Sequence, residues 1–287
     1  MERLTSTQNQ LVKELMQLRE RRGRREAGCF MVEGVRFVQE AFRSGAPIVR
    51  LLADDAGMSI LSALLQTYPG PEPIWVASHI LEKLSDTKTP QGVIAVVRLP
   101  VSGMTGMGAF ISRQPQAGGL PGWFPDGDSP LKTGCRHILA LEHVQDPGNV
   151  GTMIRTADAC GFDAVVLSAD SADPWQPKVL RSTMGSIWHL PVTVVDDLPS
   201  AVKAAREAGF MAIAAHPRNA AACWDTPMAD NVILVIGNEA GGISLEMLGN
   251  ADRTVMVPME GGAESLNAAA AASMLMYESL RQRRLSR

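Results

Sequence analysis

Short apolar runs alternate with helical patterns along the second half of the chain. The expected strands lie at residues 138–141, 164–167, 192–195, 211–215, 232–236 and 254–258, and the expected helices lie at 150–160, 178–188, 200–208 and 266–283. Short apolar runs bounded by turn residues are typical of strands buried on both faces. Because these strands alternate with helices, we expect a mainly parallel sheet covered by helices on both sides.

The first hundred residues predict a smaller α/β unit. Its expected helices lie at residues 8–22 and 35–44, and its expected strands lie at 30–33, 49–53, 74–77 and 93–99. Residues 101–133 have scattered Gly, Pro, Ser and Gln and no apolar period, which is typical of a linker or an exposed loop. Such a segment is either functional or flexible, and its composition does not decide between the two. We therefore expect domains at 1–100 and 134–287, joined by 101–133.

Composition places the chain among ordinary soluble globular proteins. Of its 287 residues, 46% are hydrophobic and 20% are charged. No stretch is long and apolar enough to span a membrane, and no apolar signal core follows the N-terminus, so we expect a cytoplasmic protein. The four cysteines are far apart and form no CxxC pair, which argues against a zinc knuckle or a disulfide framework. We expect no metal site.

A local cluster of positive charge stands out against a net charge of −3. The basic residues of this segment are Lys13, Arg19, Arg21, Arg22, Arg24 and Arg25, and only two glutamates lie among them. Such a cluster can hold a nucleic-acid phosphate backbone. The alternative interpretation is a solvated helix face with no ligand.

Three loops at expected strand ends carry unusual residues. They span 142–151, 237–242 and 259–267, and they combine glycines with amides and carboxylates. Glycine lets a backbone approach a ligand closely, and Asn149 can cap the helix that follows it. Neither a GxGxxG after the first strand nor a P-loop is present, which disfavours a nucleotide-dependent transferase or oxidoreductase. Each loop alone also fits an ordinary capped turn.

Taken together, the three loops resemble a known family. The runs are Asn149-x-Gly151-x-x-x-Arg155-Thr156-Ala157, Gly237-Asn238-Glu239-x-x-Gly242-Ile243, and Pro258-Met259 with Ser265-Leu266-Asn267. Their order and spacing resemble the three motifs of the SpoU (TrmH-like) RNA 2′-O-ribose methyltransferases of the SPOUT superfamily. Segment 178–186 is similar to a family helix. Segments 6–9, 30–34 and 89–93 are similar to the small ribosomal-protein-like substrate-binding domain that many members carry.

The resemblance implies a fold and an activity. It implies a C-terminal domain with a trefoil knot, although knots are otherwise nearly absent from proteins. It also implies a homodimer that transfers a methyl group from S-adenosylmethionine (AdoMet) to a ribose 2′-hydroxyl of RNA. The N-terminal domain favours ribosomal RNA as substrate. The alternatives are a tRNA 2′-O-methyltransferase and a family member that binds RNA without catalysis.

The resemblance also implies roles for individual residues. The catalytic constellation would be Arg155, Asn149, Glu239, Ser265 and Asn267. The cofactor would be surrounded by Ala215, Gly237, Val257 and Leu266. RNA would be bound by Lys13, Arg21, Arg22, Arg24, Arg25 and Arg181. Since arginine normally stays protonated, Arg155 acts either as a literal base or by orienting the hydroxyl while an RNA phosphate accepts the proton.

Overall fold

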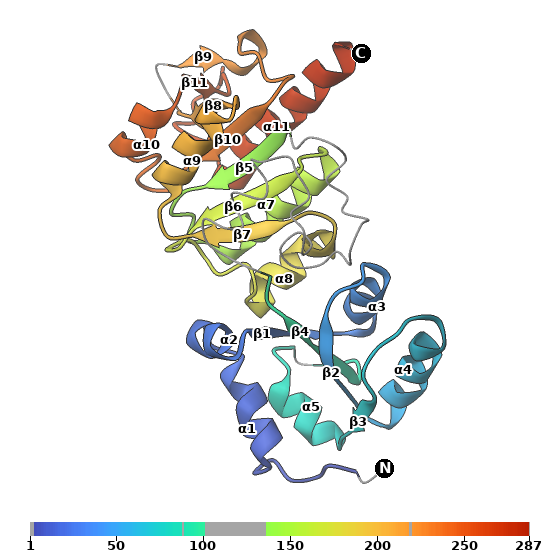
Figure 1. Ribbon diagram of the computed structural model, residues 1–287. Coiled ribbons are helices and arrows are strands. Elements are labelled where there is room, and N and C mark those ends of the chain that lie inside the picture. Colours follow the sequence, from blue (N-terminus) through green and yellow to red (C-terminus); the bar gives the residue numbers. More distant parts are fainter. Residues whose placement is uncertain (1–2, 88, 101–135, 218–219, 287) are drawn as a thin grey trace.

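Two separate β-sheets, each with helices on both faces, make up the described part of the chain (Figure 1). The computed structural model describes residues 3–87, 89–100, 136–217 and 220–286. We call the part before residue 101 the N-terminal unit and the part from residue 136 the C-terminal unit. The linker expected at 101–133 lies outside the described residues.

The N-terminal unit contains a four-stranded mixed sheet in the order β1-β4-β2-β3. Its strands are β1 (Cys29–Glu33), β2 (Ile48–Ala53), β3 (Pro73–Trp75) and β4 (Val93–Arg98). Strand β4 is antiparallel to both of its neighbours, and β2 is parallel to β3. The four strands expected from the apolar runs are all present.

Helices on the two sides of this sheet form different clusters of buried side chains. Helices α1 (Gln10–Gln17) and α5 (Ser78–Leu84) pack on one face, and α3 (Val35–Arg43) and α4 (Asp55–Thr67) pack on the other. Sequence analysis missed α4 and α5. The side chain of Asp54 caps α4 by accepting from the backbone N–H groups of its first turn.

The prediction of one continuous helix over residues 8–22 is wrong, because α1 ends at Gln17 and a second helix, α2 (Arg21–Ala27), begins after a short turn. A Cβ at Gly23 would lie 2.0 Å from the carbonyl oxygen of Gln17, so only glycine permits this close approach. The Arg24 guanidinium donates to the carbonyl oxygens of Leu18 and Arg19, each at 2.8 Å. These bonds satisfy backbone groups that the break would leave unpaired.

The C-terminal unit contains a parallel sheet of seven strands: the six that the alternating pattern predicts and the short β9, which it did not. The sheet order is β7-β6-β5-β10-β8-β11-β9, and every pairing is parallel. The strands are β5 (His137–Leu141), β6 (Ala164–Ser168), β7 (Val192–Val195), β8 (Met211–Ala215), β9 (Ala221–Ala222), β10 (Val232–Ile236) and β11 (Arg253–Met256). The trefoil knot stays a prediction, because strand order alone does not define the path of the connections.

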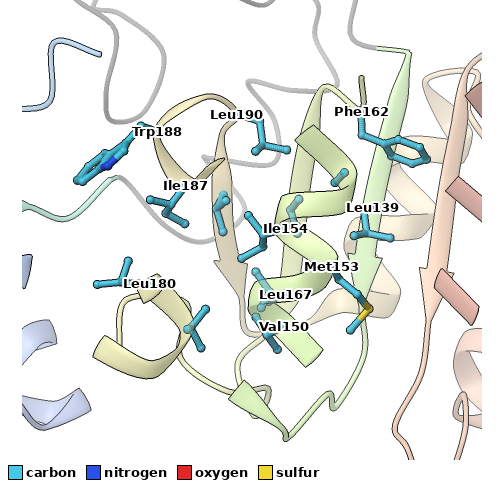
Figure 2. Packing of buried hydrophobic residues seen from close by; sticks show 14 of the residues in the cluster. Leu139, Val150, Met153, Ile154, Phe162, Leu167, Leu180, Ile187, Trp188 and Leu190 are labelled. Carbon is cyan, nitrogen blue, oxygen red and sulfur yellow. The ribbon is translucent and has the colours of Figure 1, made fainter. Parts of the chain in front are cut away.

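Alternate side chains of these strands point to opposite helix layers. Helices α7 (Pro147–Ala159), α8 (Pro177–Thr183) and α11 (Ala268–Leu285) cover one face, and α9 (Leu198–Glu207) and α10 (Leu245–Asn250) cover the other. Figure 2 shows the first layer, with Val150, Met153 and Ile154 of α7 beside Leu139 and Leu167 of the strands. Because both faces are covered, the central strands are buried throughout.

The helix expected at residues 178–188 is interrupted. Helix α8 ends at Thr183, and Met184 and Gly185 have left-handed backbone conformations with φ of 52° and 99°. A short 3-10 helix (Ser186–Trp188) follows. Two successive left-handed residues cannot continue a right-handed helix, and the apolar period across the break hid it from sequence analysis.

Aromatic rings and one buried ion pair join the two units. The ring of Phe30 lies 5.0 Å from that of Trp175 and 6.1 Å from that of Trp188, measured between centroids. Arg24 donates from Nε to the Asp173 carboxylate at 3.0 Å, and these two side chains are only 4% and 10% exposed. Breaking a buried pair of this kind costs several kcal/mol, so it holds the units in a defined arrangement.

A buried histidine makes the stability of the C-terminal unit depend on pH. The ring of His137 is buried beside the carbonyl oxygen of Met228, and burial lowers the pKa of His137 to about 4, with a further contribution from the charge of Arg283. The unfolded chain therefore takes up this proton near pH 6.5, before the folded chain does. Stability should fall as pH drops from about 6.5 to about 4, by up to about 3 kcal/mol from this group.

His137→Gln isolates this effect, because glutamine keeps a donor for Met228 and does not titrate. Urea unfolding of both proteins at pH 7, 5.5 and 4.5 should show a shallower loss of stability in the variant. Parallel losses in the two proteins would show that His137 does not carry the dependence.

Candidate active site

The three loops singled out in the sequence meet at the carboxyl ends of the central strands. Loops 237–242 and 259–267, together with the ends of β8 and β11, line a pocket of about 340 Å³, and loop 142–151 lies beside them through the contacts of Asn149 with Glu239 and Asn267. All four residues expected around the cofactor line it, namely Ala215, Gly237, Val257 and Leu266. In open parallel sheets, ligands bind at this edge.

A tight turn after β10 forms one wall of the pocket. The backbone groups of Asn238 and Gly242 exchange two hydrogen bonds of 2.9 Å, and the Asn238 Oδ1 accepts from the N–H groups of Ala240 and Gly241 at 2.8 and 2.9 Å. A Cβ at Gly237 would lie 2.4 Å from the backbone of Gly242. Glycine at 237 is therefore a requirement of this turn.

The pocket suits a ligand that is recognised mainly through main-chain groups. Much of its wall is backbone and apolar side chains, and His216, Asn238, Glu239 and Ser265 add polar side chains. Its volume lies at the lower end of the range for small-molecule sites.

Three of the expected catalytic residues form a continuous polar chain beside the pocket. Asn149 donates from Nδ2 to Oε1 of Glu239 at 2.8 Å, and its Oδ1 accepts from Nδ2 of Asn267 at 3.1 Å. Asn267 also caps α11, because its Oδ1 accepts from the N–H groups of Ala269 and Ala270. These hydrogen bonds link the start of α7, the turn after β10 and the start of α11.

The role expected for Asn149 at the start of α7 needs a correction. The helix begins at Pro147, and the capping residue is Asp146, whose side chain accepts from the N–H of Asn149 at 2.8 Å. Asp146 was not singled out in the sequence. Because the carboxylate of Asp146 satisfies the helix end, the Asn149 side chain is available for Glu239 and Asn267.

Arg155 does not join this polar chain. It is exposed on α7, six residues beyond Asn149, which corresponds to about 9 Å along the helix axis. It does not line the pocket, and its guanidinium makes no hydrogen bond or ion pair within residues 3–87, 89–100, 136–217 and 220–286. Its guanidinium is therefore available for a ligand on the outer face of α7.

The basic residues expected to bind RNA fall into two groups. Lys13, Arg22 and Arg25 are exposed on the N-terminal unit, although Arg22 pairs with Glu26 one turn away. The other members, Arg21, Arg24 and Arg181, bind protein groups in the other unit.

Each member of the second group makes at least one contact that crosses between the units. Arg21 donates to the carbonyl oxygens of Ala169 and Ser171, and Arg181 donates to the Asp86 carboxylate at 2.7 Å. The buried Arg24 is fully engaged by Asp173, Leu18 and Arg19, so its expected role in RNA binding needs correction. These partners lie far away in the sequence, and no local signal identifies them.

Sequence analysis also missed a buried carboxylate that supports the pocket. Glu142 is only 2% exposed, and its oxygens accept from the N–H and Oγ of Ser244 at 2.9 and 2.6 Å. Ser244 in turn caps α10. Glu142 thereby fixes the far end of the turn after β10 to strand β5.

Within the described residues, no cluster of side chains suited to a metal ion occurs, and no helix is long and apolar enough to cross a membrane.

Comparison with known proteins identifies relatives for both units. Residues 136–277 match the SpoU rRNA methylase family, and residues 9–95 match the MRM3-like substrate binding domain. The chain is 34% identical over 279 residues to the 23S rRNA (guanosine(2553)-2′-O)-methyltransferase RlmP of Bacillus subtilis (strain 168), an alignment that covers 96% of this chain and 98% of the relative.

Two solved structures bound to AdoMet are similar to the whole chain. One is an rRNA methyltransferase from Sinorhizobium meliloti, with a TM-score of 0.79 and 27% identity over 98% of this chain and 97% of that one. The other is the SpoU methyltransferase AviRb from Streptomyces viridochromogenes, with a TM-score of 0.76 and 30% identity over 97% of this chain and 100% of that one. The similarity therefore extends over both units.

Proposed function

This chain belongs to the SpoU rRNA methylase family, and on that basis we propose that it transfers the methyl group of AdoMet to a ribose 2′-hydroxyl of ribosomal RNA. The observation that carries the proposal is the pocket at the ends of β8, β10 and β11, which lies beside the Glu239–Asn149–Asn267 chain. The pocket and these hydrogen-bonded side chains belong to a protein whose sequence aligns over nearly its full length with a 2′-O-methyltransferase.

The residues around the pocket fit AdoMet. Ala215, Gly237, Val257 and Leu266 would hold the adenosine through backbone groups and apolar contacts. When bound, AdoMet supplies an electrophilic methyl group on a positively charged sulfur. Glu239 lines the same pocket, and the negative charge of its side chain would favour a cation there electrostatically.

Methyl transfer would form an O–CH₃ bond at the ribose, break the S–CH₃ bond of the donor with S-adenosylhomocysteine as the leaving group, and release the proton of the 2′-hydroxyl. A ribose hydroxyl is a very weak acid, so a group must orient it and help to remove that proton. We assign this role to Arg155, whose guanidinium is exposed and unpaired within the described residues. Since an arginine stays protonated, it orients the hydroxyl while an RNA phosphate accepts the proton.

We assign RNA binding to the N-terminal unit, which matches a substrate binding domain. Among the exposed cations there, Lys13, Arg22 and Arg25 lie in or beside the basic segment and suit phosphate contacts. An enzyme of ribosomal RNA works where ribosomes are made, so we place this protein in the cytoplasm.

Mapping of ribose methylation in a strain that lacks the gene tests the substrate. We expect one 2′-O-methylated nucleotide to disappear from ribosomal RNA and to return with the intact gene. Loss of methylation in tRNA alone would contradict the assignment to ribosomal RNA.

We also propose that the protein is a homodimer, as the family resemblance implies. The outer face of α11 exposes Met274 and Tyr277, which are 47% and 65% exposed. This face continues onto α7, because the hydroxyls of Thr156 and Ser273 lie 3.2 Å apart. Exposed apolar side chains beside the helix of Arg155 suit a second copy of the chain.

Replacing Met274 and Tyr277 together by glutamate should convert the dimer to a monomer, because the buried charges would go unpaired. Sedimentation velocity measures this directly. Leu245→Glu is the matched control, since Leu245 is 88% exposed on α10, in the opposite helix layer. A double variant that sediments like the wild type would contradict the assigned face.

A further inference from the structure

His143, in the loop after β5, has an unusual backbone conformation and contacts the turn that forms the pocket wall. Its φ is 53°, in the left-handed region, and Met184 is the one other described non-glycine residue with positive φ. This conformation costs a histidine about 1–2 kcal/mol. Strain of this kind persists only where surrounding contacts enforce it, and it often marks a functional position.

Three contacts hold His143 in this conformation. Its N–H donates to Oγ of Ser168 at 2.9 Å, its Nδ1 pairs with the carboxylate of Asp170, and its carbonyl oxygen accepts from Nδ2 of Asn238 at 2.8 Å. The first two contacts fix the residue to the end of β6 and to the turn that follows it. The third connects it to the turn that forms the pocket wall.

Asp170 is itself firmly placed. Its Oδ1 accepts from the Ser168 hydroxyl at 2.6 Å, and its backbone oxygen accepts from Nε2 of Gln145 at 3.3 Å. Burial raises the pKa of Asp170, but hydrogen bonds from Ser168 and His143 outweigh this and hold it below its usual value. The carboxylate therefore stays ionised as a partner for His143.

The carbonyl of His143 determines how Asn238 is oriented. With its Nδ2 bound to that carbonyl, Asn238 directs Oδ1 to the N–H groups of Ala240 and Gly241. This arrangement sets the shape of the 238–242 turn, which lines the pocket. If residue 143 left the left-handed region, its carbonyl would rotate away and Asn238 would lose the contact that orients it.

We propose that His143 and Asp170 are positioning residues for the methyl donor, acting through Asn238 on the turn that forms the pocket wall. The inference rests on the proposed function, since it takes AdoMet as the ligand of this pocket. Neither residue lines the pocket, so both act on the ligand through this turn.

The same turn after β6 receives a contact from the N-terminal unit. Arg21 donates to the carbonyl oxygens of Ala169 and Ser171, on either side of Asp170. The substrate-binding unit therefore contacts the segment that carries Asp170. Arg21→Ala should weaken AdoMet binding in the same direction as Asp170→Ala, but less, because Ser168 still holds the carboxylate.

Isothermal titration calorimetry with AdoMet alone tests the pair. We expect His143→Ala and Asp170→Ala each to raise the Kd for AdoMet about tenfold. The double variant should raise it no further, because both substitutions remove the same interaction. Thermal melts of each variant establish that the fold is intact.

His143→Asn is the decisive control. Asparagine accepts the left-handed conformation more readily than most residues, and its Nδ2 occupies the same place along the side chain as Nδ1 of histidine. It should therefore bind AdoMet within about twofold of the wild type.

In steady-state assays, the alanine variants should have a higher KM for AdoMet and an unchanged KM for RNA, a difference that general destabilisation would not produce.

Wild-type affinity in both alanine variants would overturn this inference. So would His143→Asn binding as weakly as His143→Ala. Failure of the wild-type protein to bind AdoMet would overturn the proposed function together with this inference, so the two failures are distinguishable in one experiment.

Discussion

Arg155→Ala is expected to lower kcat for methyl transfer by about 10³-fold, a loss typical of removing a group that assists proton transfer in the transition state. AdoMet binding should stay within about twofold of the wild type, because Arg155 does not line the pocket. Arg155 is exposed and unpaired in the described part of the chain, so its removal should not disturb the fold. Single-turnover rates and calorimetry measure the two effects separately.

Arg155→Lys is the matched variant for this prediction. Lysine keeps the charge but loses the planar set of donors, so its rate should lie between those of the wild type and the alanine variant. An alanine variant that turns over at the wild-type rate would remove Arg155 from the mechanism.

Gly237→Ala is expected to weaken AdoMet binding by about 100-fold, because overpacking against backbone costs up to about 3 kcal/mol. The added methyl group would lie 2.4 Å from the carbonyl carbon and oxygen of Gly242, which are backbone atoms of the pocket wall. The turn must open to accept it, and the wall then moves.

Gly241→Ala provides the control within the same turn. A Cβ at Gly241 has its nearest neighbour, the Oδ1 of Asn238, at 3.8 Å, which is ordinary contact. This variant should bind AdoMet within about twofold of the wild type. Equal affinities in the two alanine variants would contradict the assignment of the pocket.

Much of the fold was predictable because it depends on local patterns. The apolar runs at 138–141, 164–167 and 232–236 became the buried cores of β5, β6 and β10, and parallel strands covered on both faces favour this composition. The break at Met184 was not predictable, because neither the apolar period nor the residue type signals a left-handed methionine. The turn at Gly23 depends on a contact with Gln17 that helical periodicity does not report.

The site residues that belong to the family motifs could be predicted from the sequence, whereas roles that depend on contacts between distant residues could not. The four expected cofactor residues line one pocket, and Asn149, Glu239 and Asn267 are hydrogen-bonded together.

The roles of other residues depend on partners far away in the sequence. The basic segment suggested RNA contacts for Arg24, but its partner Asp173 lies 149 residues away. The bond from Asn238 to His143 spans 95 residues and involves a backbone oxygen, which no sequence pattern reveals.

The reaction itself gives the most direct test of the account. The purified protein would be incubated with AdoMet tritiated in its methyl group and with unmodified ribosomal RNA, and the product would be digested to nucleosides. The account predicts label in a 2′-O-methylnucleoside from the wild type and almost none from Arg155→Ala. Label in a base-methylated nucleoside, or no label despite measurable AdoMet binding, would contradict it.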